Sequence, residues 1–132
     1  MLTRRSILLA SLAATASTLS PALAETAPAF DAKAFAEAQQ TGRPILIAIH
    51  ASWCPTCKAQ RPILSELRAD PKFKNLVYFV IDFDSQKDLV DRFGARMQST
   101  LIAFKGGQEE GRSVGDTRRD SIYALVGKAI QG

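Results

Sequence analysis

Three apolar runs stand out along the chain, at residues 45–49, 76–81 and 100–104. Each is short, rich in β-branched or aromatic residues and bounded by polar residues, Gly or Pro. Such runs are typical of strands that are buried on both faces of a sheet. Gly106-Gly107 follows the third run and predicts a hairpin, from which a more polar edge strand returns over residues 108–114.

Helix signals fill the intervals between these runs. The first helix is expected over residues 31–40, with Asp31 as its N-cap and Phe30 and Phe35 at the spacing of a hydrophobic staple. Further helices are expected from about 54 to 68, over 85–93, and from a capping-box-like start at 117–120 to about 130. This order predicts an α/β fold in which a mixed sheet of four or five strands is flanked by four helices.

Residues 1–24 have the three parts of a secretory signal peptide. Arg4-Arg5 is followed by a short apolar run and then by Ala22-Leu23-Ala24, and cleavage is expected near Ala24. The start also resembles a twin-arginine signal, so the twin-arginine and Sec routes both stay open. The apolar run is too short for a permanent membrane anchor. The mature domain, residues 25–132, is therefore expected in a bacterial periplasm.

Composition and charge exclude several classes of protein. The hydrophobic and charged fractions, 46% and 23%, are those of a globular domain, and the net charge of +4 is scattered. Nucleic-acid binding needs a basic patch, which the sequence lacks. With only two Cys and one His, a disulfide scaffold and a four-ligand zinc site are both unsupported. No metal or other cofactor is expected.

The two cysteines lie in one segment, Trp53-Cys54-Pro55-Thr56-Cys57, directly after the first strand. Cys54 is expected at a helix start, where unpaired N–H groups and the helix dipole favour a thiolate. Pro55 suits the first helical position, and Cys57 returns to the same side one turn later. This arrangement predicts thiol–disulfide exchange, which needs an exposed thiolate and a second thiol, with the Cys54 sulfur at the tip and the Cys57 sulfur one turn deeper. An inert local disulfide or half of a metal site is the alternative.

The segment Ile45 to Lys58 resembles the active-site segment of thioredoxins, and Phe30 to Gly132 resembles the thioredoxin-like superfamily. Within this superfamily the chain resembles small periplasmic members and the C-terminal thioredoxin-like domain of the transmembrane thiol reductase DsbD. The resemblance implies a thioredoxin-like fold and a redox-active Cys54–Cys57 disulfide, in which Cys54 attacks and Cys57 resolves. It also implies a substrate-facing surface formed by Trp53, Ser99 and Thr100.

Three positions depart from the thioredoxin pattern. Ala48 replaces a buried aspartate that accepts the proton of the resolving cysteine. Pro55-Thr56 replaces Gly-Pro between the cysteines, which shifts the redox potential. Ser99 replaces a cis-proline, so a trans peptide is expected at Gln98–Ser99 together with altered substrate docking, because a cis bond before a residue other than proline costs about 2.5–4 kcal/mol.

The resemblance implies a reductant that passes electrons from a membrane thiol donor of the DsbD or CcdA kind to exported proteins with disulfides, apocytochrome c among them. Oxidase or isomerase activity stays open within the same class. Two alternatives belong to other functional classes. One is a copper(I)-binding module that uses Cys54, Cys57 and His50 as ligands. The other is a redox-inactive binding domain that has kept only the fold. For His50 the plainer interpretation is that it occupies the strand end, where thioredoxins have an aromatic ring.

Overall fold

The computed structural model describes residues 28–131, so the expected signal peptide lies outside the described residues. The elements are, in chain order, α1 (Ala32–Gln40), β1 (Pro44–His50), α2 (Pro55–Ala69), the 3-10 turn η1 (Pro71–Phe73), β2 (Val77–Asp82), α3 (Lys87–Arg92), β3 (Thr100–Lys105), β4 (Gln108–Val114) and α4 (Arg119–Ile130). The order of helices and strands is as predicted, with η1 added. None of the helices in this range is long and apolar enough to cross a bilayer.

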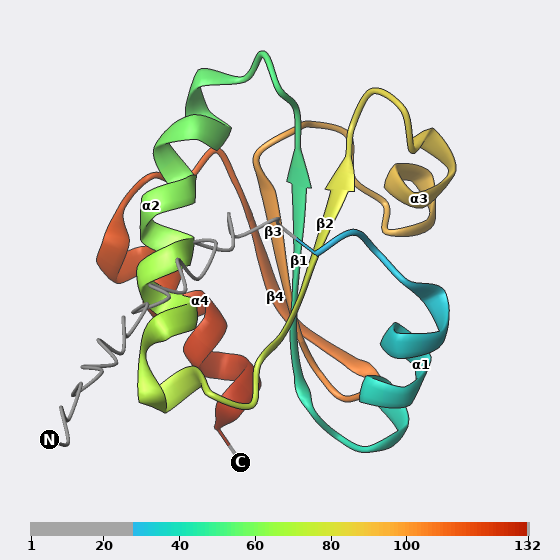
Figure 1. Cartoon of the computed structure of the whole chain (residues 1–132), viewed down its shortest axis with the longest axis vertical. Coiled ribbons are helices and arrows are strands. Elements are labelled where there is room, and N and C mark those ends of the chain that lie inside the picture. Colours follow the sequence, from blue (N-terminus) through green and yellow to red (C-terminus); the bar gives the residue numbers. More distant parts are fainter. Residues whose placement is uncertain (1–27, 132) are drawn as a thin grey trace, which may run out of the picture.

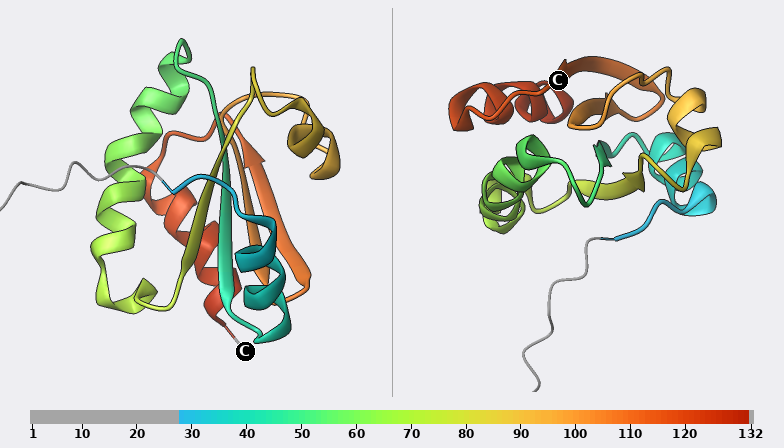
Figure 2. Two further views of the ribbon diagram at one scale, coloured as in Figure 1. Left: turned by 45° about the vertical axis from the view of Figure 1, so that its right-hand side comes forward. Right: turned by 90° about the horizontal axis from the view of Figure 1, so that it is seen from above.

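The four strands form one mixed sheet in the order β2-β1-β3-β4. β1 is parallel to β2 and antiparallel to β3, and β3 and β4 form the predicted antiparallel hairpin. α2 and α4 cover one face of the sheet and α1 and α3 the other (Figures 1 and 2). The α/β prediction is therefore confirmed with four strands. Residues 28–131 form no fifth strand, and only an isolated bridge joins Ala29 to Val80 of β2.

β1 is one of the two inner strands, and its residues 45–49 are buried on both faces as predicted. Ile45, Ile47 and Ile49 pack on the side of α1 and α3, whereas Leu46 and Ala48 pack on the side of α2 and α4. Because β1 and β2 are parallel, their carboxyl ends lie at the same end of the sheet. The loops that follow these two strands therefore meet there.

The first helix begins as predicted. The Asp31 carboxylate accepts the Ala34 N–H group at 2.8 Å, and the rings of Phe30 and Phe35 lie 5.4 Å apart. This staple joins a set of aromatic rings that packs against the sheet. The set holds α1 against the sheet.

The prediction that the second apolar run is fully buried is wrong. Within β2 only Phe79 and Ile81 are buried, and the other four residues of the strand are half-buried. β2 is an edge strand, and on its outer side only the short segment of residues 28–30 bonds to it, at Val80. Hydrophobicity alone could not show this, because Tyr78 and Val80 are apolar as well.

Two helix starts also differ from the prediction, because nearby aspartates organise turns. Asp82 accepts the Ser85 N–H group at 2.8 Å, which keeps Ser85 in a turn and delays α3. At α4 the capping box expected at 117–120 does not form, since its N-cap is Arg118 and makes no side-chain cap bond. Asp116 instead accepts the Arg118 N–H group at 3.0 Å.

Candidate active site

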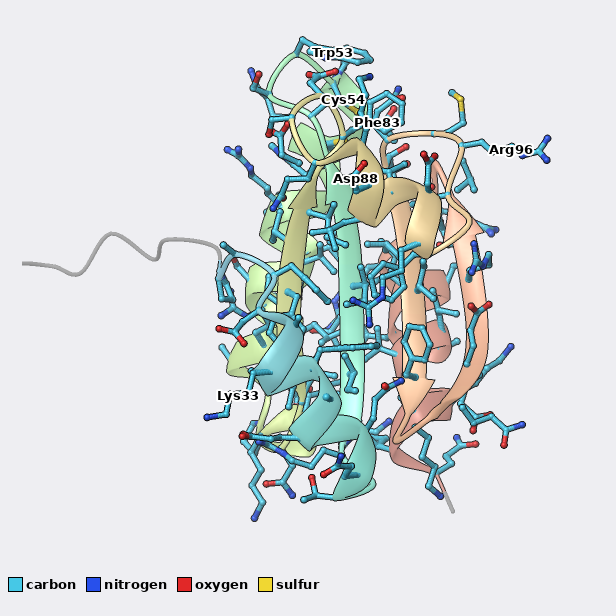
Figure 3. The ribbon with its side chains drawn as sticks, turned by 90° about the vertical axis from the view of Figure 1, so that its right-hand side faces the viewer. Lys33, Trp53, Cys54, Phe83, Asp88 and Arg96 are labelled. Carbon is cyan, nitrogen blue, oxygen red and sulfur yellow. The ribbon has the colours of Figure 1, made fainter. Side chains whose placement is uncertain are left out.

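The two cysteines lie at the end of the sheet where β1 and β2 finish. Figure 3 shows Trp53, Cys54 and Phe83 together at this end, with Lys33 of α1 towards the other. The loop from β1 to α2 supplies Trp53 and Cys54, and the loop after β2 supplies Phe83. The topology thus brings together two segments that are separate in sequence.

Cys54 is the N-cap of α2, and its sulfur accepts the Cys57 N–H group at 3.0 Å. Pro55 takes the first helical position, where its missing N–H group costs nothing. A thiolate at such a helix start is favoured by the unpaired N–H groups and by the helix dipole. The predicted placement of the pair is confirmed.

The exposure of Cys54 differs from the prediction. Cys54 is only 2% exposed and Cys57 1%, and Ala51 and Phe83 pack against the two side chains. Because its sulfur turns in to cap α2, the attacking residue is as enclosed as the resolving one. Both cysteines are free thiols in this structure. Because Cys54 is almost fully enclosed, little of its surface is accessible to a substrate disulfide.

Burial raises the pKa of the Cys57 thiol, and the hydrogen bond with Cys54 adds to this rise. The backbone donors of Ala51 and Ser99 act against it. Cys57 is therefore a neutral thiol near pH 7, whereas the resolving step needs it as a thiolate. Ala48 contributes no acid or base beside it.

Trp53 is 57% exposed, as a substrate-facing residue requires, and its indole Nε1 donates to the Asp84 carboxylate at 2.8 Å. Two further large apolar side chains, Met97 and Val114, are also at least half exposed. Met97 lies in the loop before β3, and Val114 pairs with Thr100 at the end of β4. The sequence pattern missed them, because exposure depends on neighbours from other segments.

The side chains of Ser99 and Thr100 are buried, and their role in substrate binding stays a prediction. They are 4% and 1% exposed, and the Thr100 hydroxyl donates to the Met97 carbonyl at 2.7 Å. The trans peptide at Gln98–Ser99 is confirmed, and Ser99 has a positive φ of 59°. Both side chains shape the loop from inside.

His50 lies at the end of β1, where its Nε2 is 3.2 Å from the Arg61 guanidinium. Because arginine can only donate, the His50 ring accepts this hydrogen bond as a neutral imidazole. Burial lowers the pKa of His50, the Arg61 charge lowers it further, and Asp82 opposes both. Among residues 28–131 no three His, Cys, Asp or Glu side chains are arranged to hold a metal ion.

Gln60 is a buried polar residue that the sequence analysis missed. It lies on α2 one turn after Cys57, is 3% exposed, and donates to the carbonyls of Ser99 and Asp116. Together with His50, Cys57 and Arg61 it lines a cavity of about 80 Å³ between α2 and β2. The sequence did contain one signal of this buried polar residue, because a glutamine occupies a position of the predicted helix that faces the interior.

A helix-capping Cys54 with Cys57 one turn behind it, in a mixed four-stranded sheet, is an arrangement found in known proteins. The family profile described as "Thioredoxin" matches residues 25–128. The chain belongs to the thioredoxin family. As a thioredoxin-type thiol–disulfide oxidoreductase, it has Cys54 and Cys57 as its CXXC-spaced cysteines.

Individual members of the thioredoxin family support this. The chain is 36% identical to "Thioredoxin Asp f 29" of Aspergillus fumigatus over 86 residues, which are 64% of this chain and 78% of the relative. It is 32% identical over 85 residues to the bifunctional thioredoxin reductase/thioredoxin of Mycobacterium leprae, covering 64% of this chain and 18% of that protein. The crystal structure of Trxlp from Edwardsiella tarda matches with a TM-score of 0.73 and 37% identity, covering 76% of this chain and 98% of that one.

The contact between His50 and Arg61 predicts how His50 titrates. In an NMR titration the His50 midpoint is expected below the usual value of about 6.5, since burial and the Arg61 charge both disfavour the imidazolium. Arg61→Leu is expected to raise the midpoint, and Lys58→Leu, on the exposed side of the same helix, to leave it nearly unchanged. A midpoint at or above the usual value, or one that ignores Arg61→Leu, contradicts this description.

Proposed function

We propose that the chain is an exported reductant of disulfides. Electrons reach Cys54 and Cys57 from a membrane thiol donor of the DsbD or CcdA kind and pass to disulfides of exported proteins, with apocytochrome c as one candidate substrate. In each turnover the dithiol becomes the Cys54–Cys57 disulfide, and one substrate disulfide becomes two thiols.

The surroundings of the two sulfurs carry the assignment as reductant. Strong thiol oxidants owe their potential to a stabilised reduced form. Here the Cys54 sulfur accepts the Cys57 N–H group, while burial keeps Cys57 neutral. His50, which would supply a cation if protonated, is held neutral by burial and by Arg61. The hydrogen bond from the Cys57 N–H group thus stabilises the reduced pair without help from a neighbouring cation, which favours reduction of substrates over strong oxidation.

The relative from Mycobacterium leprae supports the same direction. Its name joins a thioredoxin reductase and a thioredoxin in one protein, so there the thioredoxin part accompanies a reductase. By analogy, the present chain receives its electrons from a separate thiol donor. In this proposal the donor lies in a membrane and the chain itself is exported.

Exposed apolar side chains near the cysteines support a polypeptide substrate. Trp53 adjoins Cys54, while Met97 and Val114 flank the ends of β3 and β4 that adjoin the Ser99 loop. Exposed apolar groups gathered at one end of a domain are typical of a protein-binding surface. A small thiol such as glutathione would need no such surface.

The first residues support export. Arg4-Arg5, the apolar run and Ala22-Leu23-Ala24 form a secretory signal, and the match to the thioredoxin family begins at residue 25. The domain then starts directly after the expected cleavage site, and the product is a periplasmic protein.

The reduction potential tests the direction of electron flow. Equilibration of the mature protein with glutathione or dithiothreitol is expected to give a value near the ~−270 mV of thioredoxin rather than the ~−120 mV of a strong oxidant. The Cys54→Ser variant is the control and is expected to show no redox transition. A potential near the oxidant value would replace the reductant by an oxidase.

Export has its own test. Expressed in a Gram-negative bacterium with residues 1–24 in place, the protein is expected in the periplasmic fraction with Glu25 as its N-terminus. A matched Arg4→Ala/Arg5→Ala variant separates the routes: retention in the cytoplasm indicates the twin-arginine route, and continued export indicates Sec. Cytoplasmic, uncleaved wild-type protein would refute the periplasmic assignment.

A further inference from the structure

A substrate disulfide has to reach Cys54, yet only 2% of this residue is exposed. Part of the cover comes from another segment, because Phe83, in the loop after β2, packs against the cysteines. Figure 3 shows Phe83 and Cys54 together at this end of the sheet. Access to the Cys54 sulfur therefore depends on how firmly two loops are held together: the cysteine loop, residues 51–54, and the Phe83 loop, residues 83–86.

The Phe83 loop is held by its own backbone. The carboxylate of Asp82, the last residue of β2, accepts the Asp84 N–H group at 3.0 Å and the Ser85 N–H group at 2.8 Å. The Phe83 N–H group donates to the His50 carbonyl at 2.8 Å, which anchors the base of the loop to the end of β1. These bonds fix the backbone of the Phe83 loop without any contribution from the cysteine loop.

One side-chain hydrogen bond joins the tips of the two loops. The Trp53 Nε1 donates to the Asp84 carboxylate at 2.8 Å, and within residues 28–131 it is the one side-chain bond between these loops. Trp53 adjoins Cys54 in the chain, and Asp84 adjoins Phe83. The bond thus completes a ring of contacts around the sulfur, in which Phe83 packs back onto Cys54. A charged acceptor makes this bond stronger than a neutral one.

We propose that Asp84 is a positioning residue that limits access to Cys54, because its bond to Trp53 keeps the two loops closed over the sulfur. Trp53 and Asp84 are both exposed, so water or an incoming polypeptide can compete for the indole N–H group. Once the bond is broken, the Cys54 thiolate bonds to one substrate sulfur and the substrate S–S bond breaks. The other sulfur leaves as a thiolate that solvent protonates. This inference goes beyond the direction of electron flow, since a reductant and an oxidase both need access to Cys54.

Alkylation of Cys54 measures this access. In a Cys57→Ser background Cys54 is the sole thiol. Its rate of reaction with iodoacetamide, a neutral reagent, is read on the alkaline plateau, where the thiolate is fully formed. Asp84→Ala is expected to raise this rate about three- to tenfold, since about one hydrogen bond is lost. The fluorescence of Trp53, the only tryptophan of the chain, is expected to change as the indole loses its partner.

Asp88→Ala in the same background is the matched control, because it removes an exposed carboxylate of α3 near the Phe83 loop and keeps the bond to Trp53 (Figure 3). It is expected to keep the unmodified rate.

Trp53→Phe removes the donor but keeps an aromatic ring, and it decides the question if Asp84→Ala does not fold in a urea titration. It is expected to raise the rate as Asp84→Ala does, and the two changes together are expected to raise it no further. An unchanged rate in the folded variants, an equal rise in Asp88→Ala, or additive effects of the two changes overturns the role of Asp84. If these alkylation rates are as expected but the reduction potential is that of a strong oxidant, the proposed reductant fails and this inference stands.

Discussion

The Cys57 N–H group reaches the Cys54 sulfur at 3.0 Å because β1 delivers the chain to the end of the sheet just where α2 begins. The bond places one sulfur at the helix start, where negative charge is favoured, and the other one turn behind it. Pro55 adapts the backbone to this start without the loss of a donor. The transfer of a disulfide from a substrate to Cys54 and Cys57 depends on this spacing between the two sulfurs.

Burial sets the conditions under which this pair works. Cys54 and Cys57 are both nearly enclosed, and burial raises the pKa of the Cys57 thiol, so that its thiolate needs local stabilisation. Ala48 offers none, and His50 is neutral and already accepts from Arg61. Gln60, buried one turn after Cys57, donates instead to the carbonyls of Ser99 and Asp116 and so ties two loops to α2.

Much of the fold follows from local sequence signals, while the details of the site do not. Apolar runs, Asp31 and the Gly106-Gly107 pair predicted the strands, the first helix and the hairpin, because each acts through near neighbours. The edge position of β2 and the turn at Asp116 depend on which elements pair in space. For the same reason the burial of Ser99 and Thr100, and the long-range bonds of Gln60, could not be deduced from spacing.

Trapping of mixed disulfides in the periplasm tests most directly whether Cys54 attacks and Cys57 resolves. In the Cys57→Ser variant the attack still occurs but nothing releases the partner, so covalent adducts with exported proteins are expected to accumulate on Cys54. Cys54→Ser leaves only the inner thiol and is expected to trap far fewer partners. Equal trapping by the two variants, or none by either, would contradict the assignment of these roles.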